Sequence, residues 1–229
     1  MAGKKRAGRR NVQQGIICEG MSFAASEAYK LLRTNLLFSL PEKHCHIIGV
    51  TSSVRGEGKS TTSVNLSYTI AQSGKRVLLI DADMRRPALV RLLVEKGTPG
   101  LSNVLAGIAE EEDAIRKELY PNLDVMFSGD TPPNPSELLS SERMQKMVER
   151  LSLVYDYILI DTPPAGVVAD ACIVANLLDG VLLLVRQGRS RRDALAHAVN
   201  QLNLTNAKLL GVVLNGVPRE HGKHYGYYD

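Results

Sequence analysis

The chain has 229 residues, which is enough for one large domain with a full core. Its hydrophobic content is 44% and its charged content is 23%, a balance typical of a soluble globular protein. The net charge is +4, but residues 1–10 carry five basic side chains and no acidic one. Removing those five from +4 leaves −1 for residues 11–229, which argues against a body that binds nucleic acid.

Cysteine usage and hydropathy indicate the compartment. Cys18, Cys45 and Cys172 show no C-x-x-C spacing, which disfavours a disulfide framework or a zinc site and fits a reducing cytosol. The apolar run Val181–Val185 is far too short to span a membrane. Polar residues follow the basic start, so it does not resemble a signal peptide. We therefore expect a cytoplasmic protein, which would reach the inner face of the cell membrane only through a partner.

The elements are predicted in chain order from periodicity and from turn signals. Ser22 is expected to cap a first helix that ends before Pro41, and Ser141 to cap a later one. Helices are predicted at residues 23–38, at about 59–72, up to about 94, and at 101–105, 110–119, 141–153, 169–177 and 193–202. Strands are predicted at residues 47–50, 77–80, 123–127, 157–160, 180–185 and 209–214.

Strands that are apolar throughout, separated by helices, indicate a mostly parallel sheet covered by helices on both faces. The sequence therefore predicts an α/β fold. Residues 1–20 are expected to form a flexible basic arm, residues 21–216 a single domain, and residues 217–229 a flexible tyrosine-rich tail.

The segment Thr51–Thr61 joins the first predicted strand to the helix that begins near Lys59. Gly56 and Gly58 allow successive backbone N–H groups to turn inward, and the helix adds its positive dipole end, so the segment predicts a phosphate cradle. In such a loop Lys59 reaches the β- and γ-phosphates, and the Ser60 hydroxyl ligates Mg²⁺. The usual pattern G-x-x-x-x-G-K-[ST] has glycine where this chain has Ser53.

Polar side chains follow three further strands at the point where each strand ends. Asp81 and Asp83 follow the second strand, Asp161 follows another, and Asn215 follows the last. Ligands of open α/β sheets bind at this edge. A lone acid at a strand end is usually a turn former or a helix cap, but three acids beside a phosphate loop favour a magnesium site.

The three motifs together resemble those of a known family. The loop around Lys59, the run Val77–Arg85 and the run Ile158–Pro164 look like the Walker A, A′ and B motifs of bacterial tyrosine kinases, the CapB- and CpsD-like BY-kinases. The A′ form, a hydrophobic strand followed by Asp-x-Asp-x-Arg, separates these kinases from ordinary phosphate-loop ATPases. The resemblance covers residues from about 22 to the end and implies the phosphate-loop architecture shared with ParA and MinD.

The resemblance implies an ATP- and Mg²⁺-dependent protein-tyrosine kinase that regulates capsule or exopolysaccharide synthesis. Lys59 would stabilise the transferring phosphoryl group, and Asp81 is the likelier proton acceptor, with Asp83 on the metal or assisting. Mg²⁺ would be held by Ser60, Asp83 and Asp161. Asn215 would read the adenine edge. The set expected to bind the nucleotide is Ser53, Gly56, Glu57, Gly58, Lys59, Ser60, Thr61 and Asn215.

Two flanking features also resemble the family. Glu27, Lys30 and Arg33 match its E-x-x-R-x-x-R oligomerisation helix, with Lys30 in place of the first arginine. The residues alone favour a solvated charged face for this trio; the resemblance implies a head-to-tail homo-oligomeric ring. The tyrosine cluster near the C-terminal end is similar to the family's autophosphorylated tail, and its phosphoacceptors would be Tyr225, Tyr227 and Tyr228.

Partners and rival functions follow from the same comparison. Because the chain has no membrane segment, the resemblance implies a separate membrane activator, together with protein tyrosine substrates. One alternative is a ParA/MinD-type ATPase, but those proteins usually carry a second loop lysine at the position of Val54. Another is a nucleotide-gated regulatory partner with little turnover. An iron–sulfur carrier is disfavoured because the cysteines are widely separated.

Overall fold

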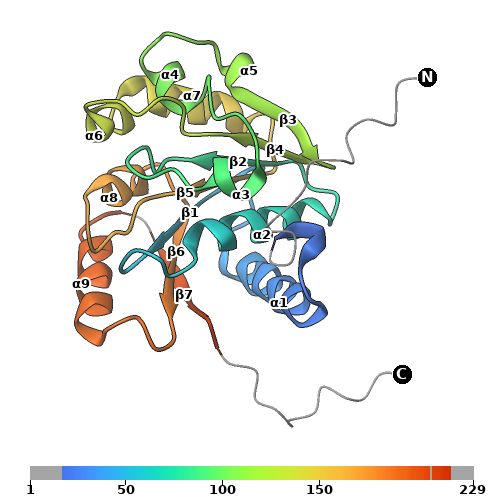
Figure 1. Ribbon diagram of the computed structural model, residues 1–229, viewed down its shortest axis with the longest axis vertical. Coiled ribbons are helices and arrows are strands. Elements are labelled where there is room, and N and C mark those ends of the chain that lie inside the picture. The colour runs from blue at the N-terminus through green and yellow to red at the C-terminus, as the bar shows by residue number, and fades with distance from the viewer. Residues whose placement is uncertain (1–16, 207, 218–229) are drawn as a thin grey trace.

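The computed structural model describes residues 17–206 and 208–217. The strands are β1 (His46–Ser52), β2 (Val77–Asp81), β3 (Ile115–Tyr120), β4 (Leu123–Met126), β5 (Tyr157–Asp161), β6 (Gly180–Arg186) and β7 (Leu209–Asn215). They form one sheet in the order β3-β4-β2-β5-β1-β6-β7, in which every neighbouring pair is parallel except β3 and β4. Figure 1 shows helices on both faces of this sheet, which confirms the predicted fold class.

The helices also lie close to their predicted positions. They are α1 (Phe23–Ser39), α2 (Lys59–Ala71), α3 (Leu89–Leu93), α4 (Leu101–Leu105), α5 (Glu111–Ala114), α6 (Pro135–Leu139), α7 (Glu142–Ser152), α8 (Asp170–Ala175) and α9 (Arg192–Asn203), with a 3₁₀ turn at Cys18–Gly20. The predicted caps are confirmed, since the Ser22 and Ser141 side chains accept hydrogen bonds from the third residue after each.

The central strands are buried on both faces because helices cover both sides of the sheet. Along β2, Leu78 and Ile80 pack in a core with α4, α6, α7 and α8. The alternate residues Val77 and Leu79 pack in a second core with α1, α2 and α3. Successive side chains of a strand point to opposite faces, so a strand buried twice must be apolar throughout, as its sequence is.

One predicted helix is wrong. Residues 110–119 form a helix only over α5, and Ile115–Tyr120 form the edge strand β3, antiparallel to β4. Hydrogen bonding to β4 overrides the local helical pattern here. The Glu118 N–H also donates to the Asp124 carboxylate at 2.7 Å. A pairing of this kind depends on a partner strand, which helical spacing does not report.

The packed body begins earlier than residue 21. Ile17 and Cys18 are buried against the second core, and the Cys18 N–H donates to the Asn65 side chain on α2 at 2.8 Å. These residues therefore belong to the folded domain and not to the arm predicted for residues 1–20.

Candidate functional site

The phosphate loop joins β1 to α2 at the carboxyl edge of the sheet. Gly56 and Gly58 have φ angles of +79° and +94°, in the left-handed region that favours glycine. At Gly58 a Cβ would come within 2.1 Å of the Asn215 amide nitrogen, so a larger residue cannot fit unless that side chain moves. The loop is wrapped as its glycines predict, and Lys59 opens the helix.

The structure explains why Ser53 replaces the usual glycine. Its hydroxyl donates to the Glu57 carboxylate at 2.8 Å, and the Val54 N–H donates to the same carboxylate at 2.9 Å. Ser190, in the turn between β6 and α9, adds a third donor to Glu57. Glu57 is fully buried. This cluster, which we call the Glu57 clamp, ties the phosphate loop to a turn 133 residues away.

Asn215 contacts the same loop. Its amide nitrogen donates to the Glu57 carbonyl oxygen at 2.9 Å, and its own oxygen accepts from the Gly216 N–H. The structure therefore brings Asn215 to the phosphate loop, as expected of a residue at the end of β7.

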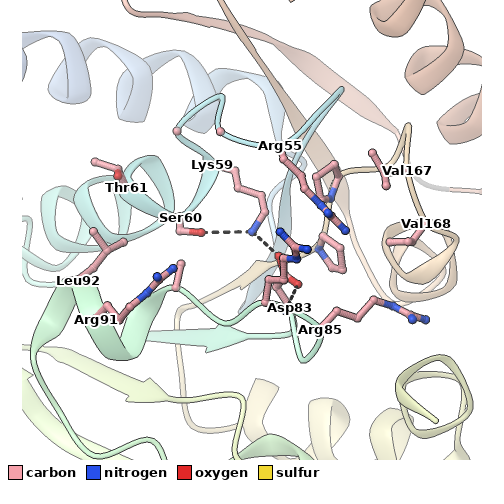
Figure 2. A pocket seen from close by; sticks show the side chains of 16 residues that line it. Arg55, Lys59, Ser60, Thr61, Asp83, Arg85, Arg91, Leu92, Val167 and Val168 are labelled. Atoms are coloured by element: carbon pink, nitrogen blue, oxygen red, sulfur yellow. Dashed lines mark hydrogen bonds and ion pairs between the residues drawn. The ribbon is translucent and has the colours of Figure 1, made fainter. Parts of the chain in front are cut away.

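Lys59 lies where the strand ends converge. Its ammonium is 3.0 Å from Asp83, 3.3 Å from Asp161 and 3.2 Å from the Ser60 hydroxyl, as Figure 2 shows for Asp83 and Ser60. Burial alone would lower the pKa of Lys59, but the carboxylates of Asp161, Asp83 and Asp81 outweigh burial and raise it. The lysine is thus a firmly held cation beside converging carboxylates.

Two of the three aspartates are fully buried, and the third borders the cavity. Asp161 is fully buried on β5, and Ser63 donates to it at 3.0 Å. Asp81 is also fully buried, and its two oxygens accept the Asp83 and Leu89 N–H groups at 3.1 and 3.3 Å. Burial and then the Asp161 carboxylate raise the pKa of Asp81 to about 8. Asp83 alone among them lines the cavity in front of the loop.

That cavity has a volume of about 500 Å³. Of the eight residues expected to bind nucleotide, five line the cavity, and the other three are joined by hydrogen bonds that hold the loop in shape. Lining residues are Gly56, Gly58, Lys59, Ser60 and Thr61; the supporting ones are Ser53, Glu57 and Asn215. Its lining is otherwise strongly basic: Arg55 lies on the loop itself, and Arg85 and Arg91 come from the segment after β2, as Figure 2 labels them.

Asp170 is a residue of this region that the sequence analysis missed. It is fully buried at the start of α8, and its carboxylate accepts from Arg85 at 2.7 and 3.1 Å and from the Ser136 hydroxyl at 2.7 Å. Burial alone would raise the pKa of Asp170, but the hydrogen bonds from Arg85 and Ser136 outweigh it and lower the pKa. The contact fixes the turn that carries Asp83. The one feature of the sequence that could have pointed to Asp170 is its position shortly after the Pro163-Pro164 turn.

The site chemistry fits Mg²⁺. Within residues 17–206 and 208–217 no group of three or more His, Cys, Asp or Glu side chains forms a ready-made metal cage. Mg²⁺ is usually held by one or two carboxylates together with substrate phosphates and water. Ser60, Asp83 and Asp161, gathered around the Lys59 ammonium, supply oxygens of that kind.

The predicted oligomerisation trio divides into two. Glu27 and Lys30 are exposed and form an ion pair at 2.7 Å. Arg33 is half-buried, and its guanidinium donates to the Thr69 carbonyl oxygen on α2 at 2.8 Å. The predicted phosphoacceptors Tyr225, Tyr227 and Tyr228 lie outside the described residues.

Comparisons with known proteins agree with this geometry. A family model described as an AAA domain matches residues 45–206. The tyrosine-protein kinase YwqD of Bacillus subtilis is 39% identical over 228 residues, covering all of this chain and 96% of the relative. The chain belongs to the bacterial tyrosine-kinase family.

Solved structures of this family have the same fold. The kinase domain of Escherichia coli tyrosine kinase ETK is 33% identical, with a TM-score of 0.87 over 98% of this chain and 88% of that domain. The chimerical protein CapA2B2 is 34% identical, with a TM-score of 0.84 over 92% of each chain. The recognition made from the three motifs is confirmed.

The architecture also extends to a cell division protein outside the tyrosine kinases. The MinD cell division protein of Aquifex aeolicus is 26% identical, with a TM-score of 0.61 over 76% of this chain and 70% of that chain. The chain therefore shares its sheet architecture with MinD, a member of the rival class that the sequence analysis named.

No helix in the described part of the chain is long and apolar enough to cross a membrane.

Proposed function

We propose that the chain is an ATP- and Mg²⁺-dependent protein-tyrosine kinase that phosphorylates the tail of a neighbouring copy at Tyr225, Tyr227 and Tyr228. The observation that carries the proposal is the convergence of Lys59, Asp83 and Asp161 within 3.3 Å behind a glycine-wrapped phosphate loop. Similarity to proteins named tyrosine kinases over almost the whole chain supports the same activity.

The nucleotide phosphates occupy the loop, and Lys59 stabilises the negative charge on the transferred group. Ser60, Asp83 and Asp161 would hold Mg²⁺, which when bound would neutralise charge on the nucleotide phosphates. The adenine lies towards the end of β7, where Asn215 already contacts the loop.

The two acids of the A′ turn divide the remaining work. Asp83 borders the cavity, so it can contact the metal or the incoming tyrosine hydroxyl directly. Asp81 lies beneath and holds the turn through the Asp83 and Leu89 N–H groups. We assign to Asp81 the role of proton acceptor, which requires the turn to shift on substrate binding so that one of its oxygens is released and the carboxyl is ionised, because its raised pKa favours the protonated form at neutral pH.

The family resemblance also suggests a scheme of regulation. We propose that copies assemble head to tail into a ring through Glu27, Lys30 and Arg33, that a separate membrane-anchored protein recruits and activates the kinase from the cytoplasm, and that the output is control of capsular or exopolysaccharide synthesis. The similarity to the CapA2B2 chimera supports the search for such a partner.

The experiment incubates the purified chain with ATP and Mg²⁺, maps phosphorylation by mass spectrometry and measures phosphate release. We expect phosphotyrosine in residues 217–229, abolished in Lys59→Met. The incubation is repeated with the cytoplasmic segment of a candidate activator added. Phosphate release without phosphotyrosine under both conditions would instead support a MinD-like ATPase. Nucleotide binding with neither product would support a regulatory partner.

A further inference from the structure

A second cavity lies beside the nucleotide cavity. Its volume is about 520 Å³, and it is lined by Val54, Arg55, Val167, Arg189, Arg191 and Ala194. Arg55 and Val167 line both cavities, and Figure 2 shows them at the same end of the first. A peptide whose tyrosine enters the nucleotide cavity can therefore extend its next residue into the second one.

The second cavity is strongly basic. Arg191 forms an ion pair with Asp193 at 3.0 Å. Across residues 17–206 and 208–217, by contrast, no carboxylate forms an ion pair with Arg55 or Arg189. Two guanidinium groups without anionic partners at one cavity favour a negatively charged ligand, because a planar guanidinium can pair with a carboxylate through two hydrogen bonds.

Arg189 is held in place for such a role. Its turn is bound to the phosphate loop through the Glu57 clamp, and the Arg186 guanidinium donates to the Gly56 carbonyl oxygen at 3.5 Å. The Arg189 guanidinium lies over Gly56, where a Cβ would come within 2.8 Å of it. The same contacts that shape the phosphate loop therefore fix the basic cavity relative to the site of transfer.

The chain itself contains an acceptor of matching chemistry. Asp229 directly follows Tyr228 in the sequence, and consecutive Cα atoms are about 3.8 Å apart. A peptide that presents Tyr228 as the acceptor therefore carries a carboxylate on the next residue. In the proposed function the nucleotide phosphates and the tyrosine hydroxyl occupy the nucleotide cavity, so the carboxylate of the next residue must lie outside it, and the arginine cavity borders it at Arg55 and Val167. The arginine cavity is where that carboxylate is accommodated.

We propose that the cavity of Arg55, Arg189 and Arg191 binds the carboxylate of an acidic residue that directly follows the acceptor tyrosine, so that Tyr-Asp and Tyr-Glu sequences are the preferred substrates. The inference rests on the proposed tyrosine-kinase function and adds substrate specificity to it. The cavity takes no part in the chemical step; it positions the acceptor.

The test uses the full chain with Tyr225, Tyr227 and Tyr228 replaced by Phe, so that its own tail does not compete. Two amidated peptides of residues 217–229 carry Phe at 225 and 227, leaving Tyr228 as acceptor; one keeps Asp229 and the other has Asp229→Asn. Dissociation constants are measured with fluorescent peptides and a non-hydrolysable ATP analogue, and kcat/KM is measured with ATP and Mg²⁺. The enzymes compared are the parent, Arg189→Gln/Arg191→Gln and the control Arg192→Gln, whose side chain is exposed at the first residue of α9 and does not line the cavity.

The parent enzyme and Arg192→Gln are expected to bind the Asp229 peptide about tenfold more tightly than the Asn peptide, with a similar ratio in kcat/KM. In Arg189→Gln/Arg191→Gln both ratios fall to about one. Equal binding of the two peptides by the parent overturns the inference even if both are phosphorylated. Preferential binding without phosphotyrosine leaves the cavity assignment standing and overturns the kinase proposal instead.

Discussion

At the scale of single residues, the site separates a carboxylate that faces the cavity from one that lies under it. Asp83 lines the cavity, whereas both oxygens of Asp81 are used by backbone N–H groups. Both acids end the same strand two residues apart, so their spacing predicts two carboxylates at one edge and cannot tell which of them faces the ligand. Their roles can therefore be separated only by measurements that distinguish direct contact with the metal from support of the turn.

Isosteric variants separate the two roles. Asp83→Asn is expected to lower kcat for tail phosphorylation by about 100-fold and to raise the Mg²⁺ concentration for half-maximal rate, because it removes a metal ligand. Asp81→Asn is expected to lower kcat by a similar factor without changing the Mg²⁺ requirement. Steady-state kinetics across a Mg²⁺ titration measure both effects, with thermal unfolding as the control for folding. A changed Mg²⁺ requirement in Asp81→Asn and not in Asp83→Asn would reverse the assignment.

Asp170 gives a prediction about stability. Because Asp170 is fully buried against a partly exposed Arg85, Asp170→Asn is expected to destabilise the fold by about 2 kcal/mol at pH 7. The folded pKa of Asp170 lies below the ordinary value of 3.8, so its ionised form stabilises the fold above that value and the contribution is lost as pH falls through the folded pKa.

Urea unfolding of both chains at pH 7 and at pH values below 4 measures this contribution. The difference in unfolding free energy between the parent and Asp170→Asn should shrink at the acidic end. A difference that is constant with pH would show that the charge of Asp170 does not contribute.

At the scale of elements, α1 is held on α2 by the side chain of Arg33, which the family resemblance assigns to a subunit contact. Arg33→Ala removes the hydrogen bond to the Thr69 carbonyl oxygen and is expected to cost about 1 kcal/mol of stability in the isolated subunit. Lys30→Ala breaks only the exposed pair with Glu27 and serves as the control, with an expected cost below about 0.5 kcal/mol.

Chemical denaturation at a protein concentration where the chain is monomeric measures both variants. Equal stability of Arg33→Ala and Lys30→Ala would mean that the α1–α2 hydrogen bond contributes nothing measurable, and Arg33 would then be free to serve a neighbour alone.

The comparison of sequence with structure also belongs at this scale. Apolar runs predicted each parallel strand, and in the central strands burial on both faces leaves no room for polar residues. The motifs predicted which side chains meet at the strand ends. What could not be predicted depends on tertiary partners: β3 forms by pairing with β4 in the sheet, and the Glu57 clamp needs Ser190, 133 residues away. The Arg85–Asp170 contact, 85 residues apart, is of the same kind.

At the scale of the whole molecule, transfer to a neighbouring copy couples assembly to phosphorylation. Each phosphotyrosine adds a charge of roughly −1.5 to −2 near the acids of the site. Repulsion between the modified tail and Asp83 should weaken tail docking and loosen the ring. The solution mass, measured by light scattering before and after incubation with ATP and Mg²⁺, is expected to fall. An unchanged mass with phosphate on all three tail tyrosines would contradict the coupling.

The most direct test of the central claim mixes two defective chains. One carries Lys59→Met and an intact tail, so it can accept phosphate but not transfer it. The other has Tyr225, Tyr227 and Tyr228 replaced by Phe, so it can transfer phosphate but offers no tail acceptor. With ATP and Mg²⁺, the account predicts phosphotyrosine on the tail of the Lys59→Met chain in the mixture and none on that chain alone. Absence of phosphotyrosine from the mixture, under conditions where the unmodified chain phosphorylates its own tail, would contradict transfer between copies, and its absence from every sample would contradict the kinase itself.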